Sequence, residues 1–377
     1  MSDQNPSAQA SHPPGAEAGP ALFTPLAIRG VTFPNRIAVS PMCQYCATDG
    51  YADDWHLVHL GSRAVGGAGL VFTEATAVTP QGRISTGDLG IWDDRHIDHL
   101  ARISAFVRRM GAVSAIQLAH AGRKASCLPP WMGGAKVASD LDGGWPVVCP
   151  SPIPFAEGEP VPAPLDEAGI HGVTAAFVAA ARRAVRAGFE VVELHAAHGY
   201  LLHQFLSPLS NTRTDDYGGS LENRLRLPVA VAAAIRRVLP EATPLFVRIS
   251  ATDWVEGGWD LEQSVALAQA LLRVGVDLID VSSGALVPYA TIPAAPGFQL
   301  PFAAAIRERA DIKTAAVGLI TEPGQAEEVI ASRKADLVFM GREMLREPYW
   351  ALKAAQVLGA EPKWPTQYGY AVKRRPA

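Results

Sequence analysis

The fold of this chain is decided by one stretch, Phe189-Glu-Val-Val-Glu-Leu194 followed by His195-Ala-Ala-His198-Gly-Tyr200. The first half is a short apolar run typical of a buried strand, and the second half changes abruptly to polar side chains. In α/β proteins, ligands bind where parallel strands give way to loops at their carboxyl ends. Two imidazoles and a phenol at such a point are suited to holding a substrate oxygen while a proton is delivered.

The strand at 191–194 is one of eight segments with this character. The others are 36–40, 70–74, 113–118, 245–249, 278–282, 314–317 and 336–340. Ala-rich amphipathic stretches, predicted to be helices, lie between them at 173–187, 225–238, 261–274 and 322–333. Strands alternating with helices are typical of a parallel sheet. Eight such units in 377 residues predict an α/β fold, a (β/α)8 TIM barrel.

Two segments depart from the repeating pattern. Residues 124–165 are rich in Pro and Gly, and we interpret them as an excursion after the third strand that caps the barrel mouth. A disordered linker is the alternative, but Trp131, Trp145 and Phe155 favour a packed segment. Residues 1–21 are rich in Ser, Ala, Pro and Gly and are predicted to be a disordered tail. They lack the basic start and the apolar run of a secretory signal.

Composition excludes several classes of function. The chain is 48% hydrophobic and carries a net charge of −4, so nothing in its charge favours nucleic acid or an anionic membrane. No apolar run is long enough to span a bilayer. Only four cysteines are present, and the Cys43/Cys46 pair has no second pair to complete a zinc site. We therefore expect no metal and a reducing, cytoplasmic compartment.

Other predicted strand ends carry groups with more than one interpretation. Arg248 lies within an apolar strand, so it needs an acceptor, either a ligand or a structural partner such as Glu193. Gly318 and the Gly341-Arg342 pair close the last two strands, where barrels commonly bind phosphate. His195 and His198 also have a spacing found in metal sites, which leaves a metal-dependent lyase or aldolase as an alternative.

Five stretches together carry a family resemblance. They are Asn35-Arg-Ile-Ala-Val-Ser-Pro-Met-Cys-Gln-Tyr45, Gly66-Gly-Ala-Gly-Leu70 with Glu74-Ala-Thr-Ala-Val78, Gln117-Leu-Ala-His-Ala-Gly-Arg-Lys124, His195-Ala-Ala-His-Gly-Tyr200, and Leu206-Ser-Pro-Leu-Ser-Asn-Thr-Arg213 running into Asp216-Tyr-Gly-Gly-Ser-Leu-Glu-Asn-Arg224. In this order they resemble the old yellow enzyme family of FMN-dependent ene-reductases, in particular its bacterial branch of xenobiotic reductases, NADPH dehydrogenases and thermophilic-like ene-reductases. The resemblance covers nearly all of the chain beyond about residue 22.

This resemblance implies a tightly but non-covalently bound FMN, which is reduced by NADPH. The residues that it implies for FMN binding are Ser40, Pro41, Met42, Cys43, Ala75, Gln117, Arg248, Ser283, Gly284, Gly318, Gly341 and Arg342. Within this set, Cys43 is expected to adjust the redox potential, and Arg248 to lie by the flavin N1 edge, where charge gathers on reduction. No Gly-x-Gly-x-x-Gly follows a strand, so NADPH is expected to be a transient substrate.

The implied reaction is reduction of an activated alkene: an enone, a maleimide or a nitroalkene. Tyr45, His195, His198 and Tyr200 would bind the substrate, and the catalytic residues would be the two histidines with Tyr200 as the acid. Hydride would pass from flavin N5 to the β-carbon, and Tyr200 would protonate the α-carbon. A non-catalytic flavin redox sensor, with Cys43 and Cys46 as its switch, is the remaining alternative.

The resemblance also bears on domains and assembly. It places the FMN-binding barrel at 22–360 and leaves 361–377 as a C-terminal extension, expected at a subunit interface of a homodimer or homotetramer. Members of this branch often have an Arg or Trp there that reaches into a neighbouring subunit's site, and Tyr370 occupies that place in this chain.

Overall fold

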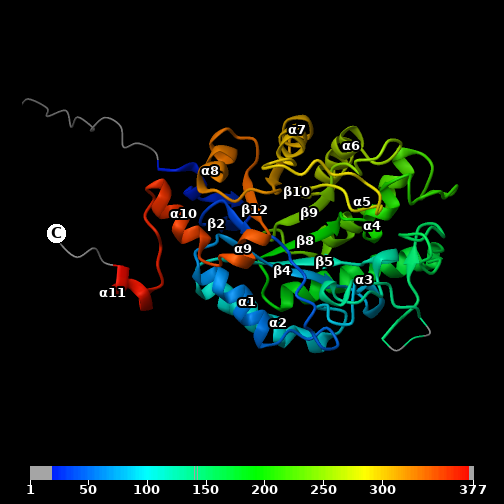
Figure 1. Cartoon of the computed structure of the whole chain (residues 1–377), viewed down its shortest axis with the longest axis horizontal. Helices are drawn as coiled ribbons and strands as arrows, with labels where there is room; N and C mark the ends of the chain where they lie inside the picture. Colours follow the sequence, from blue (N-terminus) through cyan, green and yellow to red (C-terminus); the bar gives the residue numbers. More distant parts are fainter. Residues whose placement is uncertain (1–18, 140, 142, 373–377) are drawn as a thin grey trace, which may run out of the picture.

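The computed structural model of the chain describes residues 19–139, 141 and 143–372, and the description below concerns these residues (Figure 1). The tail expected at 1–21 thus lies mostly outside the described residues, as do the last five residues of the C-terminal extension.

Eight parallel strands form a closed barrel in the order β10-β11-β12-β3-β4-β5-β8-β9. The strands are β3 (Ile37–Val39), β4 (Leu70–Ala77), β5 (Val113–Ala119), β8 (Val191–Ala196), β9 (Leu245–Ser250), β10 (Leu278–Ser282), β11 (Lys313–Ala316) and β12 (Leu337–Met340). Each coincides with one of the eight predicted segments to within a few residues. The predicted (β/α)8 barrel is therefore confirmed.

The strands are followed by helices that cover the outside of the barrel (Figure 1). These are α1 (Asp54–Val65), α2 (Ile97–Arg109), α3 (Glu167–Arg186), α5 (Leu221–Val238), α6 (Leu261–Arg273), α7 (Leu300–Ala310), α8 (Pro323–Ala331), α9 (Arg342–Arg346) and α10 (Trp350–Leu358). Four of them begin with a side chain that accepts a backbone N–H of the first turn: Asp53, Asp166, Ser220 and Asp260. None of the helices in the described part of the chain combines the length and apolar content that a bilayer crossing needs.

The two ends of the barrel are different. A hairpin of β1 (Leu26–Ile28) and β2 (Val31–Phe33) covers the amino-terminal end, where Phe33 stacks on Phe246 with ring centroids 6.2 Å apart. The carboxyl end carries the excursion at 124–165, with the short strands β6 (Val148–Cys149) and β7 (Ala163–Pro164). Figure 1 shows this excursion at the opposite end of the molecule from α10 and α11 (Gly369–Val372). With one end closed by apolar side chains, the carboxyl end is the face left for chemistry.

The turn after α1 generates a stability prediction. A Cβ added to Gly66 would collide with the backbone carbonyl of Pro348, which has little freedom to move. Gly66→Ala is therefore expected to lower the free energy of unfolding by about 1–3 kcal/mol, as overpacking does. Gly172→Ala in α3 is the matched control: it meets nothing within 4 Å, so it should raise stability by about 0.5–1 kcal/mol. Denaturant unfolding of both variants measures this, and equal stability of the two would contradict the assigned packing.

Candidate active site

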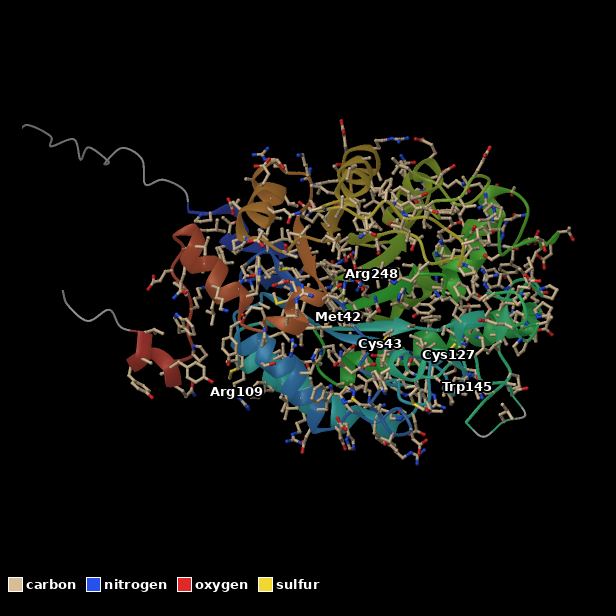
Figure 2. All side chains as sticks on the ribbon, viewed as in Figure 1. Met42, Cys43, Arg109, Cys127, Trp145 and Arg248 are labelled. Atoms are coloured by element: carbon tan, nitrogen blue, oxygen red, sulfur yellow. The ribbon has the colours of Figure 1, made fainter. Side chains whose placement is uncertain are left out.

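The residues predicted for the site gather at the carboxyl ends of the barrel strands. Ser40–Tyr45 follow β3, Ala75 and Gln117 lie in β4 and β5, and His195 ends β8 just before His198 and Tyr200. Arg248 lies in β9, Ser283 and Gly284 follow β10, Gly318 follows β11, and Gly341 and Arg342 follow β12. Figure 2 shows Met42, Cys43 and Arg248 near the middle of the molecule. Arg109 lies toward the end of the molecule that carries α10 and α11.

Three rings, from the end of β8 and the loop that follows it, form the centre of this group. The His195 ring centroid lies 5.2 Å from that of His198 and 4.9 Å from that of Tyr200, both in edge-on contact. The loop turns sharply because His198 and Gly199 both have positive φ, at 58° and 72°. A Cβ on Gly199 would collide with the Ala285 carbonyl oxygen, so glycine is required there. Backbone geometry thus presents all three rings together.

Hydrogen bonds to the protein constrain what each imidazole can donate. His195 Nδ1 accepts from the Ala197 N–H at 3.2 Å, so its Nε2 carries the proton of the neutral ring and is the donor. His198 Nε2 lies 2.7 Å from Ser282 Oγ. Nδ1 of His198 can therefore donate to a ligand only if the Ser282 hydroxyl donates to Nε2. Ser282, which was not among the predicted site residues, thus holds the His198 ring in position.

Burial and charge keep all three rings neutral. Burial, reinforced by the Arg248 charge, lowers the pKa of His195 and of His198 well below the ordinary value of an imidazole. Burial likewise raises the pKa of Tyr200 well above that of a free phenol. The histidines are thus neutral donors and the tyrosine is a protonated acid. Such a set can polarise a carbonyl or nitro oxygen and deliver one proton.

Arg248 pairs with Asp280. Its Nε lies 3.1 Å from Asp280 Oδ2, and its Nη1 donates to Ser40 Oγ at 3.1 Å. Glu193, named above as an alternative structural partner, does not form this ion pair, because strand register places Asp280 beside Arg248 while Glu193 lies beside Gln117. The Gln117 side-chain amide donates to Glu193 Oε1 at 2.8 Å. Each of these two polar pairs thus joins neighbouring strands of the barrel.

Several polar side-chain atoms of these two pairs have no hydrogen-bond partner among the described residues, and they are used here to test whether a flavin fits. Arg248 Nε, Glu193 Oε2 and both Asp280 oxygens are buried without an aligned hydrogen bond among the described residues. Burial raises the pKa of Glu193 and of Asp280, and the charge of Arg248 opposes that rise. A fixed cation of this kind, with neutral donors above it, suits the electron-rich N1 and C2-carbonyl edge of a flavin. The residues present therefore fit FMN.

The loop after β3 brings a thiol and a phenol to the mouth. Burial raises the pKa of Cys43 well above that of a free thiol, so Cys43 is protonated, and burial also raises the pKa of Tyr45. The Tyr45 ring meets Trp131 of the excursion edge-on, with centroids 5.7 Å apart. Cys43 and Cys46 are both free, and Cys46 Sγ faces the ring of His56, 3.7 Å from its Nε2. A Cys43–Cys46 switch therefore gains no support from the structure.

The residues expected to bind the ribityl chain and phosphate of FMN include a polar turn after β10. Ser283 Oγ donates to Gln299 Oε1 at 2.6 Å and accepts from Trp254 Nε1 at 3.0 Å. Gly318 has a φ of 125°, which L side chains rarely adopt, and Arg342 is exposed. Backbone N–H groups in glycine turns beside a free guanidinium are the chemistry that binds a phosphate.

Lys124 is a site residue that the sequence reasoning missed. Its Nζ donates to the His198 and Ala285 carbonyl oxygens, both at 2.9 Å, and lies 5.4 Å from the Tyr200 ring centroid. Burial lowers the pKa of Lys124 to about 8. Its place in the turn that follows β5, at the end of the Gln117–Lys124 stretch, was the available signal. Through these two hydrogen bonds, Lys124 stabilises the turn that carries His198 and Tyr200.

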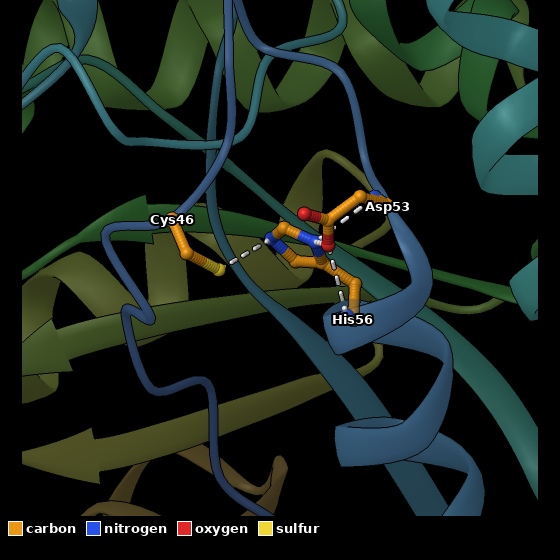
Figure 3. A group of neighbouring side chains, drawn as sticks. All are labelled: Cys46, Asp53 and His56. Atoms are coloured by element: carbon orange, nitrogen blue, oxygen red, sulfur yellow. Dashed lines mark hydrogen bonds and ion pairs between the residues drawn. The ribbon is translucent and has the colours of Figure 1, made fainter.

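Among the described residues, the side chains close enough together to hold a metal ion are Cys46, Asp53 and His56, and neither His195 nor His198 belongs to this group (Figure 3). The alternative of a metal-dependent lyase that uses those two histidines thus gains no support.

A hollow of about 980 Å³ lies away from the site, at the other end of the barrel. The ends of α1 and α2, the first described residues and the segment at 359–367 line it. It holds none of the predicted site residues.

Comparisons with known proteins all find oxidoreductases. A family model described as "NADH:flavin oxidoreductase / NADH oxidase family" matches residues 21–361. The chain is 50% identical over 349 residues to an NADPH dehydrogenase of Geobacillus thermodenitrificans, covering 92% of this chain and 97% of that protein. It is 46% identical to an NADPH dehydrogenase of Bacillus subtilis, covering 92% and 98%. Among solved structures, morphinone reductase aligns with a TM-score of 0.74 at 30% identity, covering 92% of both chains.

The neutral state of the two histidines leads to a pH prediction. Since the pKa of each is well below 6.5, neither should gain a proton between about pH 7 and 5.5, whereas ordinary imidazoles would. The dissociation constant of a non-ionisable ketone, measured by perturbation of the flavin spectrum, should therefore show no tightening from histidine protonation over that interval. Asp88→Asn is the control, because burial raises the pKa of this nearby carboxyl to about 7. Binding that tightens on acidification in both proteins would mean that the histidines become charged.

Proposed function

Because this chain belongs to the NADH:flavin oxidoreductase / NADH oxidase family, we propose that it is an ene-reductase of the old yellow enzyme type. The enzyme is a flavin-dependent oxidoreductase with FMN as its cofactor and NADPH as the donor. The proposal concerns the second half-reaction, in which an enone, maleimide or nitroalkene is reduced. The observation that carries it is the set of three neutral rings, His195, His198 and Tyr200, at the end of β8 and in the loop that follows it.

The two imidazoles are proposed to bind the oxygen of the activating carbonyl or nitro group. A neutral imidazole N–H donates without placing a full charge beside the substrate, and its contribution grows as negative charge develops on the oxygen. The Ser282 contact holds His198, and the Ala197 contact holds His195, so both donors are oriented before the substrate arrives. Pre-oriented donors of this kind avoid reorganisation during the reaction.

Tyr200 is proposed to protonate the α-carbon. Its pKa, raised by burial, keeps the proton on the phenol until carbanion character develops beside it. The Lys124 ammonium, 5.4 Å from the ring centroid, stabilises the phenolate left behind. Tyr45 and Trp131 form an aromatic wall on another side of the mouth, which we propose shapes the substrate pocket.

FMN is proposed to lie across the mouth, where it supplies the hydride at N5. The same residues that the resemblance implied are proposed to hold it: Ser40, Pro41, Met42, Cys43, Ala75, Gln117 and Arg248 at the ring, and Ser283, Gly284, Gly318, Gly341 and Arg342 at the ribityl phosphate. Arg248 supports this assignment because a buried guanidinium bonded to Ser40 Oγ lies beside the loop at 40–43.

The assembly is proposed to be a homodimer or homotetramer with the C-terminal extension at the subunit interface. The support is exposure: Tyr370 is 86% exposed near the end of the described chain, an unusual state for a large aromatic side chain. The four free cysteines support a reducing compartment, and we propose a cytoplasmic location.

Anaerobic reduction followed by reoxidation tests this function. The purified protein is expected to show a flavin absorption band that NADPH bleaches and that 2-cyclohexenone restores. Protein that binds FMN and is reduced by NADPH, but is not reoxidised by any enone, maleimide or nitroalkene, would contradict the proposal. That outcome would favour the redox-sensor alternative.

Tyr200→Phe separates the two half-reactions. NADPH should reduce the flavin of this variant at nearly the wild-type rate, while reoxidation by the alkene should slow about 10²- to 10⁴-fold, the usual contribution of a positioned acid. Stopped-flow absorbance measures both steps. Tyr217→Phe, a tyrosine packed against the outer core, is the control and should change neither step. Unchanged reoxidation in Tyr200→Phe would exclude this tyrosine as the acid.

A further inference from the structure

Glu193 is a buried carboxyl group that the proposed reaction does not use. It lies in β8, between β5, which carries Gln117, and β9, which carries Arg248. Glu193 is 0% exposed and Gln117 is 1% exposed. Gln117 Nε2 donates to Glu193 Oε1 at 2.8 Å, and Glu193 Oε2 has no hydrogen-bond partner among the described residues. The contact therefore joins a carboxyl group without an assigned role to a residue proposed to hold FMN.

Three consecutive strands of the barrel, β8, β9 and β10, carry two buried carboxyl groups and one buried cation. Arg248 is 5% exposed, and Glu193 and Asp280 are each 0% exposed. Asp280 Oδ2 lies 3.1 Å from Arg248 Nε, so Asp280 is the carboxylate that balances the guanidinium. A second buried carboxylate would have no cation of its own, and protonation removes an isolated buried charge of this kind. Glu193 is therefore the carboxyl group that keeps its proton.

The influences on the pKa of Glu193 agree with this charge balance. Burial raises the pKa of Glu193 well above the ordinary value of a glutamate, and the negative charge of Asp280 raises it further. The Arg248 charge and the Gln117 hydrogen bond oppose this rise without cancelling it. A protonated Glu193 still offers a carbonyl oxygen that accepts a hydrogen bond, and it adds no charge to the barrel interior.

The Gln117 side-chain amide has two ends of opposite character, an NH₂ group that donates and an oxygen that accepts. Because Nε2 donates to Glu193, the amide oxygen is directed away from Glu193 and is kept as an acceptor for another group. The pyrimidine edge of a flavin presents an N–H donor, at N3, between two carbonyl oxygens. An amide oxygen that is held in place can accept the N3–H, whereas an amide turned over would present a second donor to it.

We propose that Glu193, as an uncharged acid, is a positioning residue that holds the Gln117 amide with its oxygen toward the N3–H of FMN. This inference rests on the proposed placement of FMN at the barrel mouth. An uncharged acid is suited to this role because a carboxylate would oppose the negative charge that a flavin gains on reduction. Glu193 thus selects one orientation of Gln117 and leaves the balance between Arg248 and Asp280 undisturbed.

The competing arrangement contains an ionised Glu193. Its carboxylate would also accept the Gln117 N–H, but its negative charge would make the flavin harder to reduce. The two arrangements share the same contact and differ in charge. The orientation of Gln117 and the charge of Glu193 therefore need separate measurements.

A double-mutant cycle tests the orientation. Glu193→Leu and Gln117→Leu should each weaken FMN binding to the apoprotein about 5- to 10-fold, the usual contribution of one hydrogen bond. The double variant should lose no more than Gln117→Leu alone, because Glu193 acts through Gln117. Fluorescence titration with FMN measures the dissociation constants. In holoenzyme that carries FMN labelled with nitrogen-15 at N3, NMR should show faster exchange of the N3 proton with solvent in both single variants.

Three outcomes of the cycle would overturn the proposal. Additive losses in the double variant would mean that Glu193 affects FMN independently of Gln117. An N3 proton that stays protected in Glu193→Leu, while Gln117→Leu exposes it, would refute the inference and leave the proposed FMN site intact. No change in Gln117→Leu itself would refute the proposed FMN contact and the inference together. Glu193→Met, which is unbranched like glutamate, replaces Glu193→Leu if the leucine variant does not fold.

Glu193→Gln tests the charge, since the new amide can still accept from Gln117. The midpoint potential of bound FMN at neutral pH should match that of the wild type, because one uncharged group replaces another. The matched control is Asp280→Asn, which removes an ionised carboxylate and should shift the potential to a more positive value. The infrared difference spectrum between wild type and Glu193→Gln should contain the C=O stretch of a protonated carboxylic acid. Absence of that band, or a positive shift as large as that of Asp280→Asn, would overturn the uncharged acid.

Discussion

One buried positive charge organises the barrel mouth. Arg248 is 5% exposed in the wall of the barrel, so its surroundings have to accommodate a buried guanidinium. Asp280 lies 3.1 Å away on one side, and the Ser40 hydroxyl accepts on another. The same charge reinforces burial in lowering the pKa of His195 and His198. Burial and this arginine together keep two imidazoles neutral, and the arginine also provides a fixed counter-charge for an electron-rich ligand.

The mouth is rigid because backbone geometry and side-chain contacts constrain the same loop. Positive φ at His198 and Gly199 turns the chain, and the Lys124 ammonium ties the His198 carbonyl to that of Ala285. Behind Gly199, His203 Nδ1 accepts its N–H at 2.9 Å, while His203 Nε2 lies 3.0 Å from Asp253. Donors that are held before a ligand arrives need no reorganisation when charge develops, which is the main electrostatic advantage of an enzyme site.

The loop between β3 and α1 relates the catalytic face to the cluster behind it. Glu74 lies in β4 directly before Ala75, and one of its oxygens holds the Gln44 N–H beside Cys43. Its other oxygen faces His56, which Asp53 orients from the start of α1. The His56–Glu74 pair is therefore connected through Glu74 to the backbone of the loop that lines the mouth. A buried carboxylate that serves two neighbours at once is a natural point of coupling.

Local sequence determined the barrel and the position of its site. Eight apolar runs followed by amphipathic segments specify parallel strands and covering helices, and polar residues at the ends of those runs then have to meet at one face. Only the tertiary structure decided which groups pair across that face. Register between neighbouring strands, which no single strand encodes, placed Asp280 rather than Glu193 against Arg248. Lys124 and Ser282 acquire their roles in the same way. Both contact His198, which lies 74 residues after Lys124 and 84 residues before Ser282, so the contacts form only when the barrel closes.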